Sequence, residues 1–114
     1  MRWRRAGNFS TSTAGSNSIA ALDQVVFFPF SDFLLHDMGS LGDGIAQGSA
    51  GQTEMRTAPL WGARAQTSFL HDGRASTISA AILAHDGQGR AAKVQFKNLS
   101  AGDQANLIAF VNSL

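Results

Sequence analysis

The sequence contains no cysteine. The chain therefore cannot form a disulfide, a zinc–thiolate site, a cysteine nucleophile or a thioether link to a prosthetic group. Long apolar runs are also absent, because no window approaches the roughly 18 consecutive apolar residues that a membrane-spanning helix needs. From these two absences we expect no covalently attached group and no membrane span.

Charge is scarce and almost balanced, with nine Lys and Arg against eight Asp and Glu and a formal net charge of +1. Three of the basic residues, Arg2, Arg4 and Arg5, lie in the first five positions, so the remainder is close to neutral. Nucleic-acid binding requires a concentrated basic surface, and we therefore expect no nucleic-acid partner. The 114 residues are enough for one small domain and too few for two separate cores.

The first 20 residues are rich in Ser, Thr, Gly and Asn and have little periodicity, which predicts a disordered or leader-like segment. The charged start 1–5 resembles the first part of a signal peptide, but the following residues 8–13 are polar rather than apolar. We therefore expect no export signal in this chain, and one folded unit over 21–114.

Beyond residue 20 the chain changes from apolar to glycine-rich. Residues 22–35 are apolar and aromatic, and Pro29 interrupts a continuous helix, which predicts an extended segment packed on a core. Five glycines then fall between Gly39 and Gly51, which indicates an irregular loop of the kind that often lines a ligand.

The last third of the sequence predicts helices. Ser76 or Thr77 can cap a helix that runs to about His85, and apolar spacing places His85 on its buried face. A shorter helix is expected over 91–97, and a final one begins at Ser100 with Asp103 at the capping-box position. The predicted fold class is all-α, with long irregular loops and a disordered N-terminus.

Each of the three histidines precedes an aspartate, at His36, His71 and His85. Imidazole is a common metal ligand, and a neighbouring carboxylate can set its tautomer. The pattern has simpler interpretations too, because His85 fits a core position and the other two fit turns. Signatures of metalloproteases, EF-hands, phosphate-binding loops and serine hydrolases are absent.

Several motifs in order resemble the di-haem oxidoreductases that are related to bacterial di-haem cytochrome c peroxidase. They are the segments 31–39 (SDFLLHDMG), 56–62 (RTAPLWG), 69–75 (FLHDGRA), 77–85 (TISAAILAH) and 109–114 (AFVNSL). The resemblance implies that 21–114 is the C-terminal part of a cytochrome c-like haem domain. It also implies haem c as the cofactor, and hydrogen peroxide or a similar acceptor as the substrate of the parent protein.

The resemblance also implies roles for individual residues. His85 falls where the family places the distal ligand of the electron-transfer haem, which makes it the metal-ligand candidate. His71 would lie in the haem pocket near a propionate, and Arg56 is a second propionate partner or else a surface ion pair. Trp61 would pack in the pocket, and Met38 would line it or compete with His85 as a sulfur ligand.

Two departures from the family pattern limit these expectations. The C-x-x-C-H motif that attaches the haem and supplies the proximal histidine is missing, and residues 1–18 do not resemble the family. Also, the chain reads His-Asp-Gly-Gln-Gly at 85–89 where relatives often read His-Gly-Gly-Glu-Ala, so the family's glutamate is replaced by Gln88. We therefore expect a fragment without a covalent attachment site and, by itself, without peroxidase activity.

The resemblance implies a periplasmic parent whose N-terminal haem domain is the missing partner, with an electron-donor protein as a further partner. Two alternatives remain open at this stage. One is a helical remnant that binds no haem and has at most a binding function. The other is a non-haem His/Asp metal hydrolase, which would explain the three His-Asp pairs but not the ordered motifs.

Overall fold

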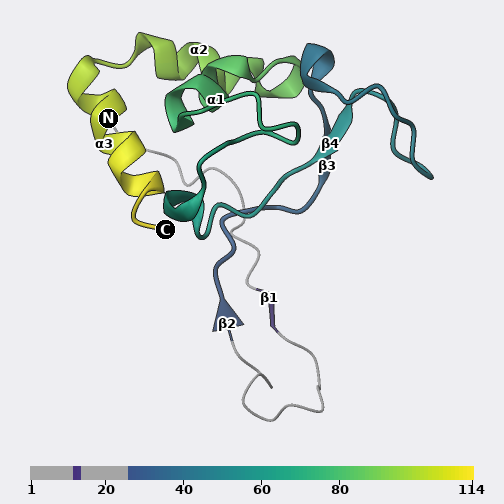
Figure 1. Ribbon diagram of the computed structural model, residues 1–114, viewed down its shortest axis with the longest axis horizontal. Helices are drawn as coiled ribbons and strands as arrows, with labels where there is room; N and C mark the ends of the chain where they lie inside the picture. Colours follow the sequence, from purple (N-terminus) through teal and green to yellow (C-terminus); the bar gives the residue numbers. More distant parts are fainter. Residues whose placement is uncertain (1–11, 14–25) are drawn as a thin grey trace.

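The computed structural model describes residues 12–13 and 26–114, and Figure 1 shows their arrangement. In chain order the strands are β1 (Ser12–Thr13), β2 (Val26–Phe27), β3 (Leu35–Asp37) and β4 (Glu54–Arg56). The α-helices are α1 (Ile78–Ala84), α2 (Arg90–Asn98) and α3 (Ala101–Val111). Single 3-10 turns lie at η2 (Gly39–Leu41), η3 (Ala63–Ala65) and η4 (Gly87–Gly89).

The predicted all-α, cytochrome c-like fold is wrong, because the described residues combine three α-helices with antiparallel strand pairs. β3 pairs with β4 so that Leu35 faces Arg56 and His36 faces Met55, and β1 pairs with β2. The glycine-rich segment between β3 and β4 makes the first pairing possible. Its positive-φ glycines, Gly44 and Gly48, allow the chain to reverse and return beside β3.

The predicted helices are confirmed, and their ends follow from local capping. The Thr77 hydroxyl accepts a hydrogen bond from the Ala80 N–H at 3.1 Å, and α1 ends one residue before His85. Ser100 caps α3 in the same way by accepting from the Asp103 N–H at 3.2 Å. α1 and α2 pack against each other, and Figure 1 shows them side by side.

The predicted extended segment is irregular in its described part, because residues 28–34 have no regular secondary structure and Phe30 and Phe33 have positive φ values of 53° and 57°. Pro29 is fully buried, and Ser31 is buried with its hydroxyl donating to the Thr57 carbonyl at 2.8 Å. The Phe30 ring meets the Phe110 ring of α3 edge-on, with centroids 6.1 Å apart. This segment therefore connects the strand pair to the C-terminal helix. The expected disorder of 1–20 falls mostly outside the described residues.

The core of the described part is thin. Its buried apolar side chains are Pro29, Leu41, Ala75 and Phe96, whereas eight large apolar side chains are exposed. Leu34 is 60% exposed and Phe28 is 55% exposed, so much of the apolar surface that could stabilise the fold stays in water. Every helix in these ranges is too short or too polar to cross a bilayer.

At Gly87, the turn between α1 and α2 packs directly on the backbone of β3 and η2. Gly87 has φ +52°, and a Cβ atom on it would lie 2.3 Å from the Asp37 carbonyl oxygen and 2.8 Å from the Gly39 nitrogen. Real Cβ atoms do not come this close to backbone, so only glycine permits the contact. This backbone contact is one of the places where the strand region meets the helices.

We expect the purified chain to be marginally stable, because its buried apolar area is small relative to the apolar area left exposed. Its helical circular-dichroism signal should disappear over a broad temperature range at a low midpoint. A sharp, cooperative calorimetric transition would contradict this expectation.

The substitution Gly87→Ala should destabilise the chain by about 3 kcal/mol or more, because it adds a backbone clash to the strain of a positive φ. Gly44→Ala is the matched control. Gly44 also has a positive φ, +76°, but its Cβ would meet nothing within 4 Å, so only the strain of about 1 kcal/mol is expected. Thermal midpoints of the helical signal measure both, and equal losses would rule out the docking contact.

Candidate functional site

His85 follows the last residue of α1, and one of its ring nitrogens is already engaged. Nδ1 lies 2.7 Å from the Ala81 carbonyl oxygen, one turn earlier in the helix. A carbonyl can only accept, so Nδ1 carries the proton and donates it. In the neutral ring Nε2 is then the nitrogen with a lone pair. The contact therefore sets the tautomer in which Nε2 can bind a metal.

Met38 and His85 meet at Gly89. A Cβ atom on Gly89 would lie 3.0 Å from the Met38 Cε and 3.2 Å from the His85 Cδ2. The thioether methyl and the imidazole edge therefore both lie within about one van der Waals contact of the same point. The structure brings these two sequence candidates together, although the glycine-rich loop, β4 and α1 lie between them in the chain.

The turn that carries His85 is also held by side chains. The Ser40 hydroxyl donates to the Asp86 carboxylate at 2.7 Å, and the Ser40 N–H points to the same oxygen at 3.4 Å. Hydrogen bonds from the Ser40 hydroxyl, the Gly87 N–H and the Ser40 N–H lower the pKa of Asp86 below its usual value. Asp86 is therefore an anchored carboxylate and not a free base.

His36 bridges two acceptors. Its Nε2 lies 2.8 Å from the Asp32 carboxylate and its Nδ1 lies 2.9 Å from the Gln88 side-chain oxygen. The hydrogen bond to Gln88, followed by that to Asp32, raises the pKa of His36 above 6.5. The N–H of Leu34, the Thr57 hydroxyl and the His36 ring lower the pKa of Asp32 to about 2. With both nitrogens engaged, His36 is unsuited to bind a metal.

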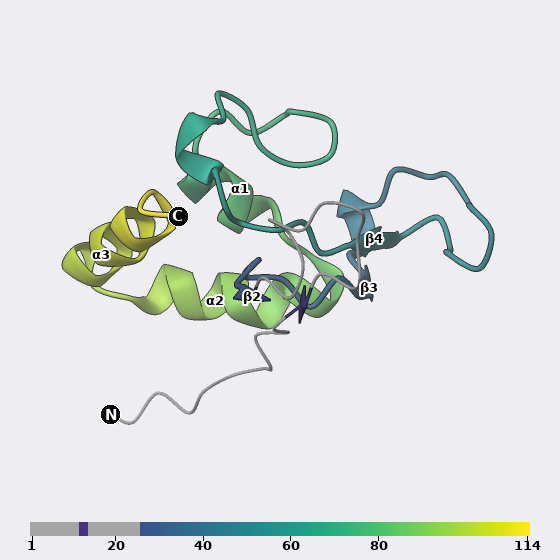
Figure 2. The same cartoon turned by 90° about the horizontal axis from the view of Figure 1, so that it is seen from below.

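The other candidates lie elsewhere. His71 is exposed in the loop between η3 and α1, which Figure 2 shows on the opposite side of α1 from α2. That loop is closed by the Phe69–Ala75 bridge and by Arg74 donating to Asp72. Trp61 is exposed beside η3. The structure therefore does not bring His71 and Trp61 into the cluster around His85.

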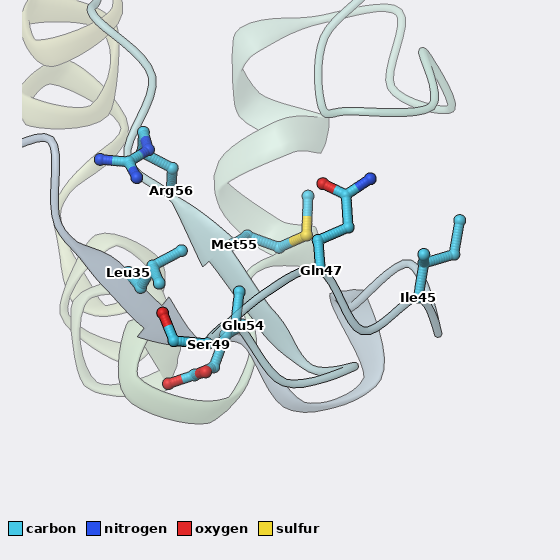
Figure 3. A pocket seen from close by; sticks show the side chains of 8 residues that line it. Leu35, Ile45, Gln47, Ser49, Glu54, Met55 and Arg56 are labelled. Carbon is cyan, nitrogen blue, oxygen red and sulfur yellow. The ribbon is translucent and has the colours of Figure 1, made fainter.

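Arg56 lies at one end of an open cavity of about 280 Å³ between the strand pair and the glycine-rich loop (Figure 3). Its Nη1 donates to the Phe33 carbonyl at 2.6 Å, and the salt bridges of the described residues do not include the surface ion pair that was the alternative to a propionate role. Ile45 and Gln47 of the loop line the cavity together with Leu35. The glycine-rich loop thus lines an open hollow.

In the part of the chain that the structure describes, no three His, Cys, Asp or Glu side chains gather closely enough to hold a metal ion. The non-haem hydrolase alternative therefore finds no ligand cluster there. What does gather is one free imidazole nitrogen and one thioether. Such a pair suits a metal whose other ligands come from a cofactor.

Sequence reasoning missed Asp32, Gln88 and Gly89. Asp32 stands four residues before His36, so the (i, i+4) pair was visible in the sequence, but that spacing indicates a contact only in a helix. Gln88 and Gly89 were noted only as departures from the family pattern. Their partners lie about fifty residues earlier, and no local signal connects them.

The His36 bridge predicts a pH dependence of stability. A raised pKa means that the contribution of His36 is complete below pH 6.5 and is lost as the pH rises through the folded-state value. The lowered pKa of Asp32 means that its contribution is complete above pH 3.8 and is lost as the pH falls toward 2. The bridge should therefore stabilise the fold most between these limits.

Comparison with His36→Gln isolates this effect. The thermal midpoint of the native chain should exceed that of the variant at pH 5, and the difference should shrink as the pH rises above 7. A difference that stays constant from pH 5 to pH 9 would show that the His36 proton contributes nothing.

Comparison with known proteins gives one match. The family model described as "Di-haem oxidoreductase, putative peroxidase" matches residues 5–114. The match begins before the boundary expected at residue 20. No curated protein and no solved structure matches the chain. Since the family model spans nearly the whole sequence, and the motifs that include His36, His71 and His85 lie inside it, the chain belongs to the di-haem oxidoreductase family.

Proposed function

We propose that this chain is the C-terminal part of a di-haem c-type peroxidase-like oxidoreductase and that it supplies His85 as the distal ligand of the electron-transfer haem. Membership of the family supports the cofactor and the class of reaction. The observation that carries the assignment to His85 is its tautomer. Because Nδ1 donates to the Ala81 carbonyl, the neutral ring offers the Nε2 lone pair to an iron atom.

The residues of this chain fit one side of a haem and not the other. His85 would provide a nitrogen ligand, and the polarisable Met38 thioether would lie near it, since both side chains approach Gly89. Thioether attachment needs two cysteines, and the sequence has none. The covalent links and the proximal histidine must therefore come from a C-x-x-C-H segment outside this sequence.

When bound, the haem supplies one-electron chemistry, and the residues of this chain hold and orient it. A second imidazole opposite the proximal one favours a low-spin iron with a lower potential than His/Met ligation gives. Arg56 and His71 are proposed as partners of the propionates. Arg56 supports this role because only one of its five N–H groups is needed for the Phe33 carbonyl.

Other parts of the proposal rest on the family alone. The parent protein would contain an N-terminal haem domain that reduces hydrogen peroxide or a similar acceptor. It would receive electrons from a donor protein and would work in the periplasm. This chain by itself would not be a peroxidase, because the peroxide-reducing haem belongs to the other domain.

The test supplies the missing half of the site in trans. A ferric haem peptide that contains C-x-x-C-H and its proximal histidine is titrated with the purified 114-residue chain, and electron paramagnetic resonance records the spin state. The native chain should convert the haem peptide to a low-spin, six-coordinate form. A haem-stained denaturing gel should show no band at the mass of the chain, because no covalent bond can form.

Three variants assign the ligand. His85→Ala should leave the haem peptide high-spin and weaken binding at least about tenfold, or about 1.4 kcal/mol. His85→Met should keep six coordination, raise the potential and introduce a sulfur-to-iron charge-transfer band. His71→Ala is the control for ligation, and it should leave the haem low-spin and six-coordinate, because His71 is proposed to contact a propionate and not the iron. If His85→Ala stays low-spin while loss of His71, His36 or Met38 gives the high-spin signal, the assignment of His85 is wrong.

A further inference from the structure

His36 lies at the centre of a bridge for which the proposed haem site gives no role. Its two ring nitrogens face the Asp32 carboxylate at 2.8 Å and the Gln88 side-chain oxygen at 2.9 Å. Both partners accept, so the bridge is complete when both nitrogens carry protons. The ring is about one-third exposed, so it is neither a core side chain nor a freely solvated one.

The bridge joins two parts of the molecule that carry the site. His36 belongs to β3, and Gln88 belongs to η4 in the turn between α1 and α2. Figure 1 shows this turn beside η2 and the strand pair, and contacts between η4 and both β3 and η2 agree with the view. Gln88 lies between two glycines. The backbone of Gly87 packs on Asp37, and the Met38 and His85 side chains both approach Gly89, which has no side chain.

The turn has few side chains of its own that could join it to the strands. Gly87 and Gly89 have none, and the hydrogen bonds within the turn, from the His85 N–H to the Ile82 carbonyl at 3.3 Å and from the Gly89 N–H to the Asp86 carbonyl at 2.9 Å, shape the turn without connecting it to β3. The bond from Ser40 fixes the start of the turn at Asp86, and the bond from His36 fixes its far end at Gln88. Together these two hydrogen bonds attach the turn to η2 and to β3.

We propose that His36 and Gln88 are positioning residues that hold the 85–90 turn so that the His85 ring and the Met38 thioether lie together at Gly89. This inference rests on the proposed function for the meaning of the site, but its geometry concerns only this chain. Neither residue touches the cofactor. Their effect on the haem is transmitted through the placement of His85.

The experiment uses nuclear magnetic resonance on the full 114-residue chain without haem. The readout is the nuclear Overhauser effect between the Met38 methyl group and the His85 Cδ2 proton, together with the tautomer of His85 from ring nitrogen shifts. In the native chain the methyl-to-ring contact should be present. Gln88→Ala removes the acceptor for His36 and should abolish the contact, while amide resonances of α3 stay in place.

Two further variants act as controls. Gln95→Ala changes an exposed glutamine in α2 and should preserve the contact. Gln88→Glu keeps an acceptor oxygen for His36 and should restore the contact that Gln88→Ala loses. A residue needed only to fill space would not distinguish the alanine from the glutamate variant in this way.

The proposal is overturned if Gln88→Ala keeps the Met38-to-His85 contact, or if Gln88→Glu loses it as Gln88→Ala does. It is also overturned if Gln88→Ala unfolds the whole chain, since Gln88 would then hold the fold and not the turn. These outcomes are independent of the haem-peptide titration. If the titration fails while the contact responds as expected, the proposed function is wrong and the positioning role stands.

Discussion

The docking of Gly87 on the backbone of Asp37 and Gly39 is the contact on which the rest of the site depends. It is made without side chains, so it brings η4 closer to β3 than any other residue would allow. Once the backbones meet, Ser40 reaches Asp86 and His36 reaches Gln88, each across about fifty residues of chain. Met38 then comes to lie beside His85. A single glycine with a positive φ thus sets the distance at which several polar contacts form.

The hydrogen bonds around this contact divide the three histidines by role. His85 has one nitrogen engaged by a carbonyl of its own helix, which leaves Nε2 as the nitrogen that we propose as a ligand. His36 has both nitrogens engaged by acceptors, so it holds the structure. His71 lies in an exposed loop whose closure depends on Asp72 and Arg74. The three His-Asp dipeptides are identical in sequence, but their imidazole rings have different surroundings and hydrogen-bond partners.

The thin core agrees with a chain that works as one side of a larger site. The described residues bury little apolar area, and exposed aromatic and aliphatic side chains lie on the irregular segment, in the glycine-rich loop, just before η3 and on all three helices. Family membership implies haem in the parent protein, and a haem with the segment that holds it would cover apolar surface. The exposed apolar side chains are therefore consistent with the proposed assembly around a cofactor.

The sequence by itself determined the elements whose signals are local. Thr77 and Ser100 fixed the starts of α1 and α3 because their hydroxyls cap the adjacent turn, and the ordered motifs identified the family. Only the tertiary structure decided the features that join distant parts of the chain. These are the pairing of β3 with β4, the burial of Pro29 and Ser31, and the bridge from Asp32 through His36 to Gln88. The reason is distance along the chain. The pairing of β3 with β4 requires the glycine-rich loop to reverse the chain, and the hydrogen bond between His36 and Gln88 requires Gly87 to pack on the backbone of Asp37 and Gly39. Neither requirement produces a periodic pattern in the sequence.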